Sequence, residues 1–249
     1  RSALETRSEF FVEYQPIVTA HVPGGIVKFE ALARWNSSTL GRVSPADFIR
    51  VAEATGLILP LAKLLLECVC ADLRANPGIS VNINISPVQL MSPGFASDIS
   101  GQVAAAGLDV RRIEIEVTET VVIGDSTAVA STLHELRSRG FSIALDDFGT
   151  GYSSVGYLAS MPFNVLKIDQ SFVTEKTTMN RPSTMIKSML GLAHSLDMVV
   201  VAEGVETARE AETLRSFGCD MLQGYHYGRP GPLNAFLNPA QLMLDFDPP

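Results

Sequence analysis

Two adjacent carboxylates, Asp146 and Asp147, follow an apolar run that ends at Leu145. The run begins after Gly140, a residue type that often ends a helix, and its composition is typical of a strand in a protein core. Two neighbouring carboxylates at the end of a buried strand are unfavourable unless cations neutralise them. The pair therefore indicates a metal site at the end of this strand.

The same arrangement recurs along the chain. Helical patterns with one apolar stripe each lie between the apolar segments, and three of them end at Gly107, Gly140 and Gly218, since glycine readily adopts the left-handed conformation that ends a helix. This alternation predicts parallel strands covered by helices. The other segments end at or beside a polar side chain that could bind a ligand, namely Asn84, Glu116, Lys167, Glu203 and Gln223.

An α/β barrel explains this pattern better than an open sheet. The chain has 249 residues, and an eight-stranded barrel has roughly 250. An open sheet would gather its ligand groups at one crevice, usually beside a glycine-rich phosphate loop, and neither GxGxxG nor a P-loop signature is present. The expected strands are residues 10–17, 27–34, 80–85, 113–117, 142–146, 165–168, 199–202 and 221–223.

Composition limits the possible classes of function. The hydrophobic fraction of 46% is enough for a large core, and no apolar run resembles a membrane span or a signal peptide, so we expect a cytoplasmic domain without direct membrane contact. A net charge of −8 argues against nucleic-acid binding, which needs a basic surface. The chain begins at Arg1 and residues 1–8 resemble the end of a linker, so we expect residues 1–249 to be a single domain cut from a longer protein with upstream sensory or signalling domains.

Cysteines and histidines give no metal-binding pattern. Cys68 and Cys70 lie two apart on a predicted helix, so they point to nearly opposite sides, and Cys219 is isolated. Of the four histidines, only His226 follows a predicted strand. A site of oxygen ligands for a hard cation is therefore more consistent with the sequence than a zinc or iron site.

Eight short motifs, in order along nearly the whole chain, resemble those of the EAL-domain family. They are YQPIV at 14–18, EALARW at 30–35, NISP at 84–87, EVTE at 116–119, DDFGTG at 146–151, KID at 167–169, EGVE at 203–206 and QGY at 223–225. The resemblance implies a modified TIM (β/α)8 barrel with an antiparallel first strand. It also implies a phosphodiesterase that hydrolyses cyclic di-GMP to linear pGpG with Mg²⁺ or Mn²⁺.

The resemblance assigns roles to individual residues. It implies that the metal ligands are Glu30, Asn84, Glu116, Asp146, Asp147 and Glu203. It implies that the catalytic residues are Lys167, Glu203, Glu30 and Asp146, with Lys167 orienting or activating the attacking water. Substrate contacts would come from Gln15, Leu32, Arg34, Gln223 and Gly224, with Arg34 at a phosphate. The loop that carries Asp147 would be supported by Glu119, Thr150 and Ser153.

Phosphodiester hydrolysis explains why such residues are needed. The reaction requires a strong nucleophile at neutral pH and neutralisation of charge on the attacking and leaving oxygens, and two cations roughly 4 Å apart supply both. A lysine among carboxylates keeps its proton, so we expect Lys167 to position water rather than to act as a base. We also expect four of the ligands to converge on one metal position at the C-terminal mouth of the barrel, namely Glu30, Asn84, Glu116 and Asp146.

Two other functions remain open. One is a non-catalytic cyclic di-GMP receptor or protein-interaction module, against which the presence of Glu30, Asp146, Lys167 and Glu203 counts. The other is a metal-dependent barrel enzyme of the enolase type, in which a lysine abstracts a proton beside a metal-bound enolate. The pair formed by Asp146 and Asp147 suits two metal ions better than one, which favours phosphoryl chemistry.

Two structural predictions concern residues around the site. Asn82 and Glu114 share strand faces with Asn84 and Glu116 but lie one layer deeper, so we expect them to form a buried hydrogen-bonded pair. The segment from Asp147 to Phe163 is rich in apolar residues. We expect either a homodimer through this loop and the following helix, as in EAL domains, or packing of these side chains on their own barrel.

Overall fold

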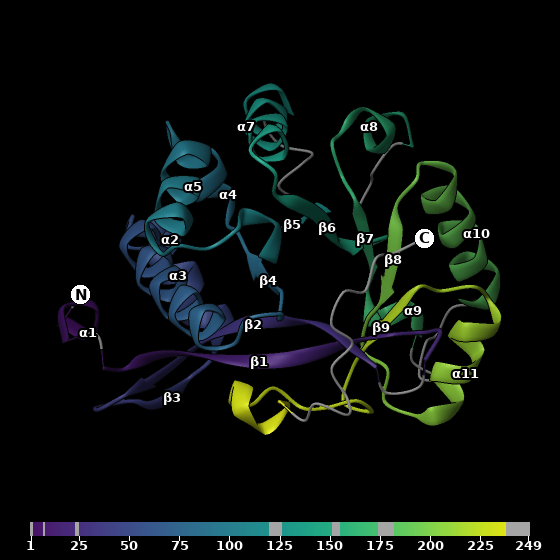
Figure 1. Ribbon diagram of the computed structural model, residues 1–249, viewed down its shortest axis with the longest axis horizontal. Coiled ribbons are helices and arrows are strands. Elements are labelled where there is room, and N and C mark those ends of the chain that lie inside the picture. The colour runs from purple at the N-terminus through teal and green to yellow at the C-terminus, as the bar shows by residue number, and fades with distance from the viewer. Residues whose placement is uncertain are drawn as a thin grey trace.

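The computed structural model describes residues 2–6, 8–22, 25–119, 126–150, 155–173 and 182–237, in which strands and helices alternate along most of the chain (Figure 1). The strands are β1 (Phe10–Thr19), β2 (Ile26–Ser37), β3 (Gly41–Val43), β4 (Val81–Asn84), β5 (Ile113–Thr118), β6 (Ser142–Phe148), β7 (Val165–Ile168), β8 (Val199–Ala202) and β9 (Met221–Gln223). The α-helices are α1 (Ser2–Thr6), α2 (Pro45–Ala54), α3 (Ile58–Ala75), α4 (Pro87–Leu90), α5 (Phe95–Ala105), α7 (Ser126–Ser138), α8 (Val155–Ser160), α9 (Gln170–Val173), α10 (Pro182–Ser195) and α11 (Ala208–Ser216). Short 3₁₀ helices are η1 (Val110–Arg112) and η2 (Leu233–Ala235).

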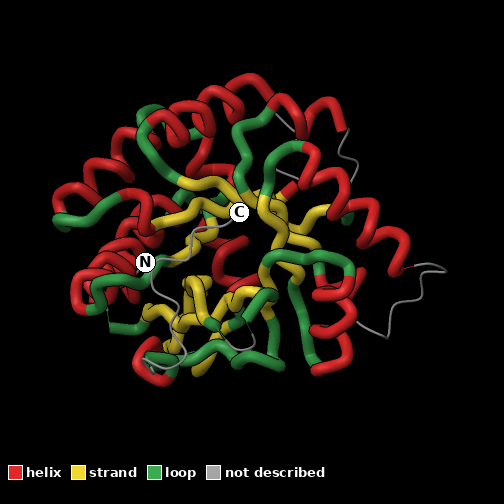
Figure 2. The backbone as a smooth tube through the Cα atoms, turned by 45° about the vertical axis from the view of Figure 1, so that its right-hand side comes forward, coloured by secondary structure: helices red, strands yellow, loops and turns green. Residues whose placement is uncertain are grey.

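The strands close into a barrel. Hydrogen bonding follows the order β1-β9-β8-β7-β6-β5-β4-β2-β3, and a further pairing of β1 with β2 closes the ring, so that β3 extends β2. β1 is antiparallel to both of its neighbours, whereas the other barrel strands pair in parallel. Helices form an arc outside the strands in Figure 2. The predicted modified TIM barrel with an antiparallel first strand is confirmed.

All eight predicted strands form, and their bounds differ from the predicted ones by at most a few residues. The largest difference is at β2, which continues to Ser37 because its end forms an antiparallel hairpin with β3. The sequence did not predict β3, since its three residues, Gly41–Val43, show no alternation of apolar and polar side chains.

The barrel interior is built in layers. Ile17, Ala144, Val165, Val201 and Met221 pack together into a small apolar cluster. Residues two apart on a strand point to the same side. The next layer toward the carboxyl ends of the parallel strands β6, β7, β8 and β9 is therefore polar, and it contains Asp146, Lys167, Glu203 and Gln223.

A separate aromatic cluster holds the antiparallel side of the barrel against α2 and α3. Phe10 of β1 stacks on Trp35 of β2 with 5.4 Å between ring centroids, and Phe48 of α2 lies edge-on to both rings. Phe10 and Phe48 are buried and Trp35 is partly buried against them, and large rings packed in this way contribute strongly to core stability. This packing fixes β1 and β2, the two strands that carry Gln15 and Glu30 to the mouth of the barrel.

Capping boxes fix the start of two helices that follow strands at the same mouth. After β4, Ser86 and Gln89 form a reciprocal capping box at the start of α4. After β8, Thr207 and Glu210 form the equivalent box at the start of α11. Each box satisfies backbone N–H groups at its helix start and so fixes the chain leaving the strand. Among the described helices, none is both long enough and apolar enough to cross a membrane.

Candidate metal centre and active site

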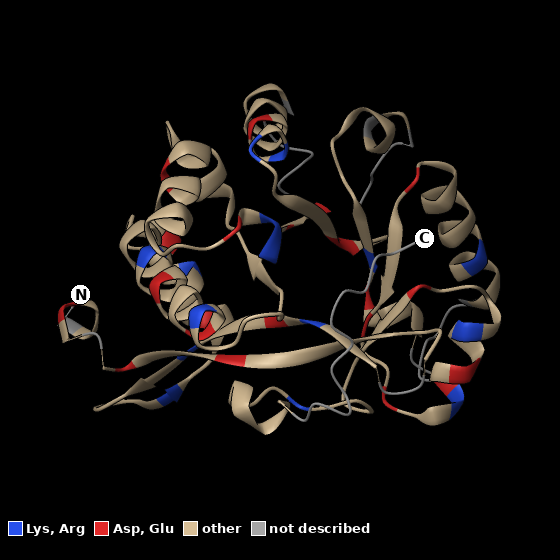
Figure 3. Ribbon diagram, viewed as in Figure 1, with Lys and Arg blue, Asp and Glu red and all other residues tan. Residues whose placement is uncertain are grey.

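Lys167 occupies the centre of the candidate site. Its side chain extends from β7 into the barrel and is fully buried. The ammonium nitrogen Nζ lies 2.7 Å from Glu203 Oε1, 2.9 Å from Glu116 Oε1, 3.2 Å from Asp146 Oδ1 and 3.7 Å from Glu30 Oε2. Acidic and basic segments accordingly lie on the central strands as well as on the outer helices in Figure 3. Four predicted site carboxylates therefore meet at one ammonium group.

Glu30 links the Lys167 cluster by hydrogen bonds to side chains of β4 and β9. Asn84 Nδ2 donates a hydrogen bond of 2.8 Å to Glu30 Oε1, and Gln223 Nε2 donates one of 2.6 Å to Glu30 Oε2. Gln223 also donates to Gln15 Oε1 over 3.1 Å. An added Cβ at Gly224 would lie 2.2 Å from backbone atoms of Val205, so only glycine allows the two segments to approach this closely.

Asn82 and Glu114 are both buried, but the predicted bond between them is wrong. Asn82 Nδ2 instead donates to Glu116 Oε1 over 2.7 Å. Glu114 Oε1 lies 2.6 Å from Lys28 Nζ, and Glu114 Oε2 accepts from Ser142 Oγ over 2.8 Å. Asn82 and Glu114 are register partners across β4 and β5, yet strands in a barrel are tilted and staggered, so side-chain contacts run diagonally to the next residue pair.

Asp147 is turned toward the mouth by an irregular backbone. Its φ angle of 56° is in the left-handed region, which aspartate tolerates better than most residues. The pairing of β6 with β7 shifts register between Leu145 and Phe148, around this residue. Carboxylate oxygens of Asp146, Asp147 and Glu203 consequently lie within 4.8 Å of one another.

The loop after Asp147 is held by two of the three residues predicted to support it. Glu119 Oε2 accepts a hydrogen bond of 3.0 Å from the Gly149 backbone N–H, and Thr150 Oγ1 donates one of 2.8 Å to the Asp147 carbonyl oxygen. Gly149 has φ 98°, and an added Cβ would lie 2.6 Å from Met189 Cε. Ser153 lies outside the described residues.

The carboxylates outnumber the ammonium group that they surround. Burial and the carboxylates of Glu30, Asp146 and Glu203 raise the pKa of Glu116 well above its ordinary value, although Lys167 opposes this. Burial and the carboxylates of Asp146 and Glu30 likewise raise the pKa of Glu203 to about 8. Without a further cation, the surplus of carboxylates therefore favours the protonated forms of Glu116 and Glu203.

Lys167 and Glu30 are charged within this cluster. Burial alone would lower the pKa of Lys167, but contacts with Glu116, Glu203, Glu30 and Asp146 raise it well above its ordinary value. Burial opposes ionisation of Glu30, but Lys167 and two amide hydrogen bonds hold the Glu30 pKa below its ordinary value. In the metal-free cluster, these contacts favour the charged forms of both Lys167 and Glu30.

A divalent cation fits these residues. Oε2 of Glu116 is buried and has no hydrogen-bond partner among the described residues, and a buried oxygen of this kind is unfavourable without a ligand. Carboxylate oxygens are the preferred ligands of Mg²⁺ and Mn²⁺. Added positive charge would also replace the protons that the excess carboxylates hold.

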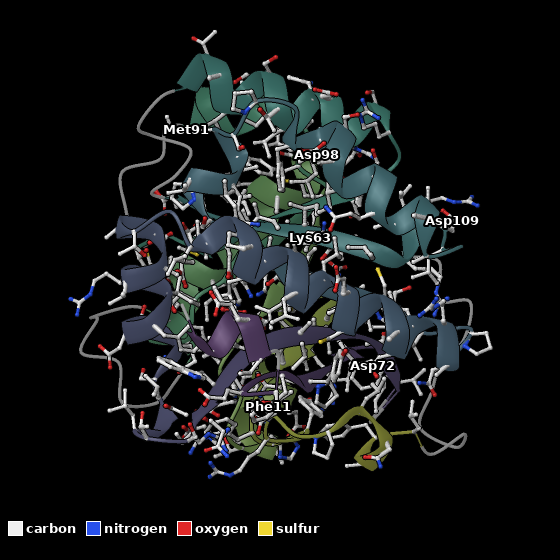
Figure 4. The ribbon with its side chains drawn as sticks, turned by 90° about the vertical axis from the view of Figure 1, so that its left-hand side faces the viewer. Phe11, Lys63, Asp72, Met91, Asp98 and Asp109 are labelled. Carbon is white, nitrogen blue, oxygen red and sulfur yellow. The ribbon has the colours of Figure 1, made fainter. Side chains whose placement is uncertain are left out.

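Two cavities lie on either side of the hydrogen bond between Asn84 and Glu30, with Glu30 lining the first and Asn84 lining the second. The first, of about 320 Å³, is lined by the carboxylate cluster and by Gln15, Gln223 and Gly224. The second, of about 620 Å³, is mainly apolar and lies between β2, β4, α3 and α5, with Leu32, Arg34 and Asn84 on its wall. Figure 4 labels Lys63 on α3 and Asp98 on α5, which also line this larger cavity. The predicted substrate contacts are therefore divided between two adjacent cavities.

Arg34 is held beside the larger cavity by an acidic partner. Its Nε donates to Glu13 Oε2 over 2.6 Å, and Arg42 Nη2 of β3 lies 2.9 Å from both oxygens of Glu13. Sequence reasoning missed Glu13, whose signal would have been its position two residues before Gln15 on the same strand face. It also gave no role to four other residues that line the smaller cavity just beyond strand ends, Asp169, Gln170, Glu206 and Tyr225.

The apolar segment that follows Asp147 packs largely inward. Phe148, Leu158, Met161 and Phe163 are all buried within this chain. Tyr152 lies outside the described residues, so its predicted place in an interface stays a prediction. The packing of these four side chains agrees with the expectation that they cover their own barrel.

Comparison with known proteins identifies the family of this chain. Residues 1–230 match the family model described as EAL domain. A signaling protein of Caulobacter vibrioides is 41% identical over 229 residues, which cover 92% of this chain and 28% of that protein. Cyclic di-GMP phosphodiesterase NbdA of Pseudomonas aeruginosa is 36% identical, with coverage of 90% and 29%. This chain spans 27–35% of the length of such curated relatives.

Solved structures agree with the family match. The structure of "PaMucR Phosphodiesterase, c-di-GMP complex" has a TM-score of 0.87 and 32% sequence identity, and the match covers 95% of this chain and 97% of that one. The fold, the site and the family match lead to the same conclusion. This chain belongs to the EAL domain family.

Proposed function

We propose that this domain is a metal-dependent phosphodiesterase that hydrolyses cyclic di-GMP to linear pGpG. The relative NbdA, which is 36% identical, is named as a cyclic di-GMP phosphodiesterase, and the relative MucR, which is 34% identical, as a bifunctional diguanylate cyclase/cyclic di-GMP phosphodiesterase. The observation that carries the proposal is the fully buried ammonium group of Lys167 among carboxylates from four different strands or strand ends at one barrel mouth. Catalytic residues of such barrels gather at this end.

The cations would be held by Glu30, Asn84, Glu116, Asp146, Asp147 and Glu203. When bound, divalent cations would activate water and neutralise charge on the scissile phosphate. The protonated Lys167 would donate a hydrogen bond to the attacking water. It would thereby hold the water oxygen on the side of the phosphorus atom opposite the P–O bond that breaks. Since Lys167 also contacts Glu203 and Asp146, those carboxylates orient its ammonium group.

Substrate binding would use both cavities. Glu30 and its bonded partner Asn84 lie where the two cavities meet. A cyclic dinucleotide would place its scissile phosphate near the carboxylates, beside Gln15, Gln223 and Gly224. The flat apolar face of one base would pack in the larger cavity near Leu32, and Arg34 would meet a phosphate.

A turnover assay tests the proposal. The purified domain is incubated with cyclic di-GMP in Mg²⁺, in Mn²⁺ and in EDTA, and the products are separated by chromatography. We expect linear pGpG only where a divalent cation is present, and none from Asp146→Asn. Tight binding of cyclic di-GMP by a folded domain that forms no product with either cation would instead support the receptor function.

We also propose that residues 147–163 take part in a homodimer and that upstream domains regulate this one. Four apolar side chains of the segment are buried within the chain, so among the described residues the contact would use the exposed positions of α8, such as Gly156 and Ala159. Sedimentation at micromolar concentration measures the assembly directly. A monomer with full activity would contradict the dimer.

A further inference from the structure

Asn82 is a buried polar residue to which the proposed reaction gives no role. It lies on β4, two residues before Asn84, and its side chain is fully buried. Its Nδ2 donates to Glu116 Oε1 over 2.7 Å, and the same oxygen lies 2.9 Å from Lys167 Nζ. Glu116 Oε2 has no hydrogen-bond partner among the described residues. One oxygen of Glu116 is therefore held from two sides, whereas the other has no donor among the described residues.

Only the nitrogen of the Asn82 side-chain amide has a hydrogen-bond partner among the described residues. Its carbonyl oxygen Oδ1 is buried and, like Glu116 Oε2, has no hydrogen-bond partner among the described residues. A buried unpaired carbonyl is unfavourable, so an apolar residue of similar size would suit the packing at this position better. The bond to Glu116 is the contact that accounts for asparagine here.

Lys167 alone would not fix the orientation of Glu116. Its ammonium group is shared among four carboxylates, and its distance to Glu203 is shorter than that to Glu116. A carboxylate held by one shared cation can rotate about its last bond and exchange its two oxygens. The Asn82 amide, which reaches Glu116 from the layer below, removes that freedom because it binds one oxygen in a defined direction.

We propose that Asn82 is a positioning residue that holds Glu116 with Oε1 toward Lys167 and Oε2 toward a divalent cation. The inference rests on the proposed function, since that function supplies the cation. Hydrogen bonds behind metal ligands commonly fix the ligand's orientation. Asn82 would act through Glu116 and would not touch substrate or metal.

Direct measurement of Mn²⁺ binding, by calorimetry without substrate, tests this role. Asn82→Leu removes the donor while keeping the number of heavy atoms and the branched shape of the side chain, and Asn82→Ala removes both the donor and most of the side chain. We expect each to weaken Mn²⁺ affinity about 10–100-fold. Ser142→Ala is the matched control, because it deletes a hydrogen bond of 2.8 Å to the other buried glutamate of β5, Glu114, and should leave Mn²⁺ affinity unchanged.

Kinetics separate a positioning role from general damage to the fold. At saturating Mn²⁺, Asn82→Leu should recover most of the wild-type kcat, and the Mn²⁺ concentration needed for half-maximal activity should rise. Unchanged Mn²⁺ affinity in both Asn82 variants would overturn the inference. Mn²⁺ binding by wild-type protein without any turnover would overturn the proposed function alone, and absence of Mn²⁺ binding would overturn both.

A measurement on the wild-type protein covers the case in which the variants do not fold. The side-chain amide protons of Asn82 should exchange slowly with solvent, and their NMR signals should shift when Mg²⁺ is added, because the cation polarises the carboxylate to which they are bonded. Signals that stay in place at saturating Mg²⁺ would overturn the inference.

Discussion

Two buried lysines lie inside the same barrel, one layer apart, in opposite electrostatic settings. Lys28 faces one carboxylate, Glu114, at 2.6 Å, and that carboxylate is further bonded to Ser142. Lys167 faces four carboxylates within 3.7 Å. We call the Lys28–Glu114 pair the lower layer and the Lys167 cluster, which lies nearer the mouth, the upper layer. The lower layer is balanced in charge, whereas the upper layer has more acidic than basic side chains.

The difference shows which layer is structural and which is prepared for a ligand. A balanced buried pair with satisfied hydrogen bonds offsets its own desolvation and leaves no charge over. An unbalanced cluster raises carboxylate pKa values, as it does for Glu116 and Glu203, and gains most from an added cation. A buried lysine therefore does not by itself indicate a ligand site, whereas a surplus of carboxylates around it favours the binding of a cation.

The largest expected effect comes from removing the upper lysine. Lys167→Met should lower kcat for cyclic di-GMP hydrolysis by roughly 10²–10³-fold or more, since it deletes a preorganised charged donor. Steady-state turnover at saturating Mg²⁺, with circular dichroism to verify folding, measures this. Lys28→Met is the matched control, and a folded Lys28→Met protein should keep its kcat. Equal losses of kcat in both variants would remove the distinction between the layers.

The lower lysine should matter instead for stability. Lys28→Met leaves Glu114 buried without its partner, and breaking a buried pair in this way costs about 3–5 kcal/mol of unfolding free energy. Urea denaturation in Mg²⁺ provides the measurement. The double variant Lys28→Met, Glu114→Leu should recover much of the loss, because no unpaired charge remains. A single variant as stable as wild type would show that Glu114 reaches solvent or another cation.

The sequence predicted the upper layer well because its signal is local. Each predicted ligand stands at the end of a recognisable apolar strand, and parallel strands of a barrel bring those ends to one mouth. Glu30, Glu116, Asp146 and Glu203 lie around Lys167, and the convergence of Glu30, Asn84, Glu116 and Asp146 on one metal position stays a prediction.

The contacts that sequence reasoning missed depend on geometry between strands. Asn82 bonds to Glu116 rather than to its register partner Glu114, since barrel strands are staggered. The positive φ angle of Asp147 depends on a register shift between β6 and β7, and no residue pattern encodes such a shift. The two layers also look alike in sequence, because the charge balance of each depends on side chains from several strands together.

The pH dependence of stability should sharpen the contrast between the layers. The pKa of Glu203 is raised in the folded domain from 4.5 to about 8, so between these values the folded state holds a proton that the unfolded chain has lost. Stability of the metal-free domain should therefore fall as pH rises from 4.5 through 8. The raised pKa values of Glu116 and Asp147 act in the same direction.

Thermal unfolding in EDTA and in Mg²⁺, from pH 6 to pH 8.5, measures this effect. The melting temperature in EDTA should decrease with pH, and Mg²⁺ should raise it most at the high end, where it replaces a lost proton. Glu203→Gln should flatten the slope in EDTA. A metal-free domain that becomes more stable toward pH 8.5 would contradict the assignment of excess negative charge to the upper layer.

The smallest effect is expected at the edge of the upper layer, where Glu119 accepts the Gly149 N–H over 3.0 Å and so holds the loop that carries Asp147. Glu119→Ala leaves the Lys167 contacts intact but allows Asp147 to move, so we expect Mg²⁺ affinity to fall about tenfold. The kcat at saturating Mg²⁺ should fall less than in Lys167→Met. Titration of activity with Mg²⁺ gives both quantities. If Glu119→Ala lost all activity at normal Mg²⁺ affinity, Glu119 would belong to the catalytic group itself, and the upper layer would extend beyond the residues that contact Lys167.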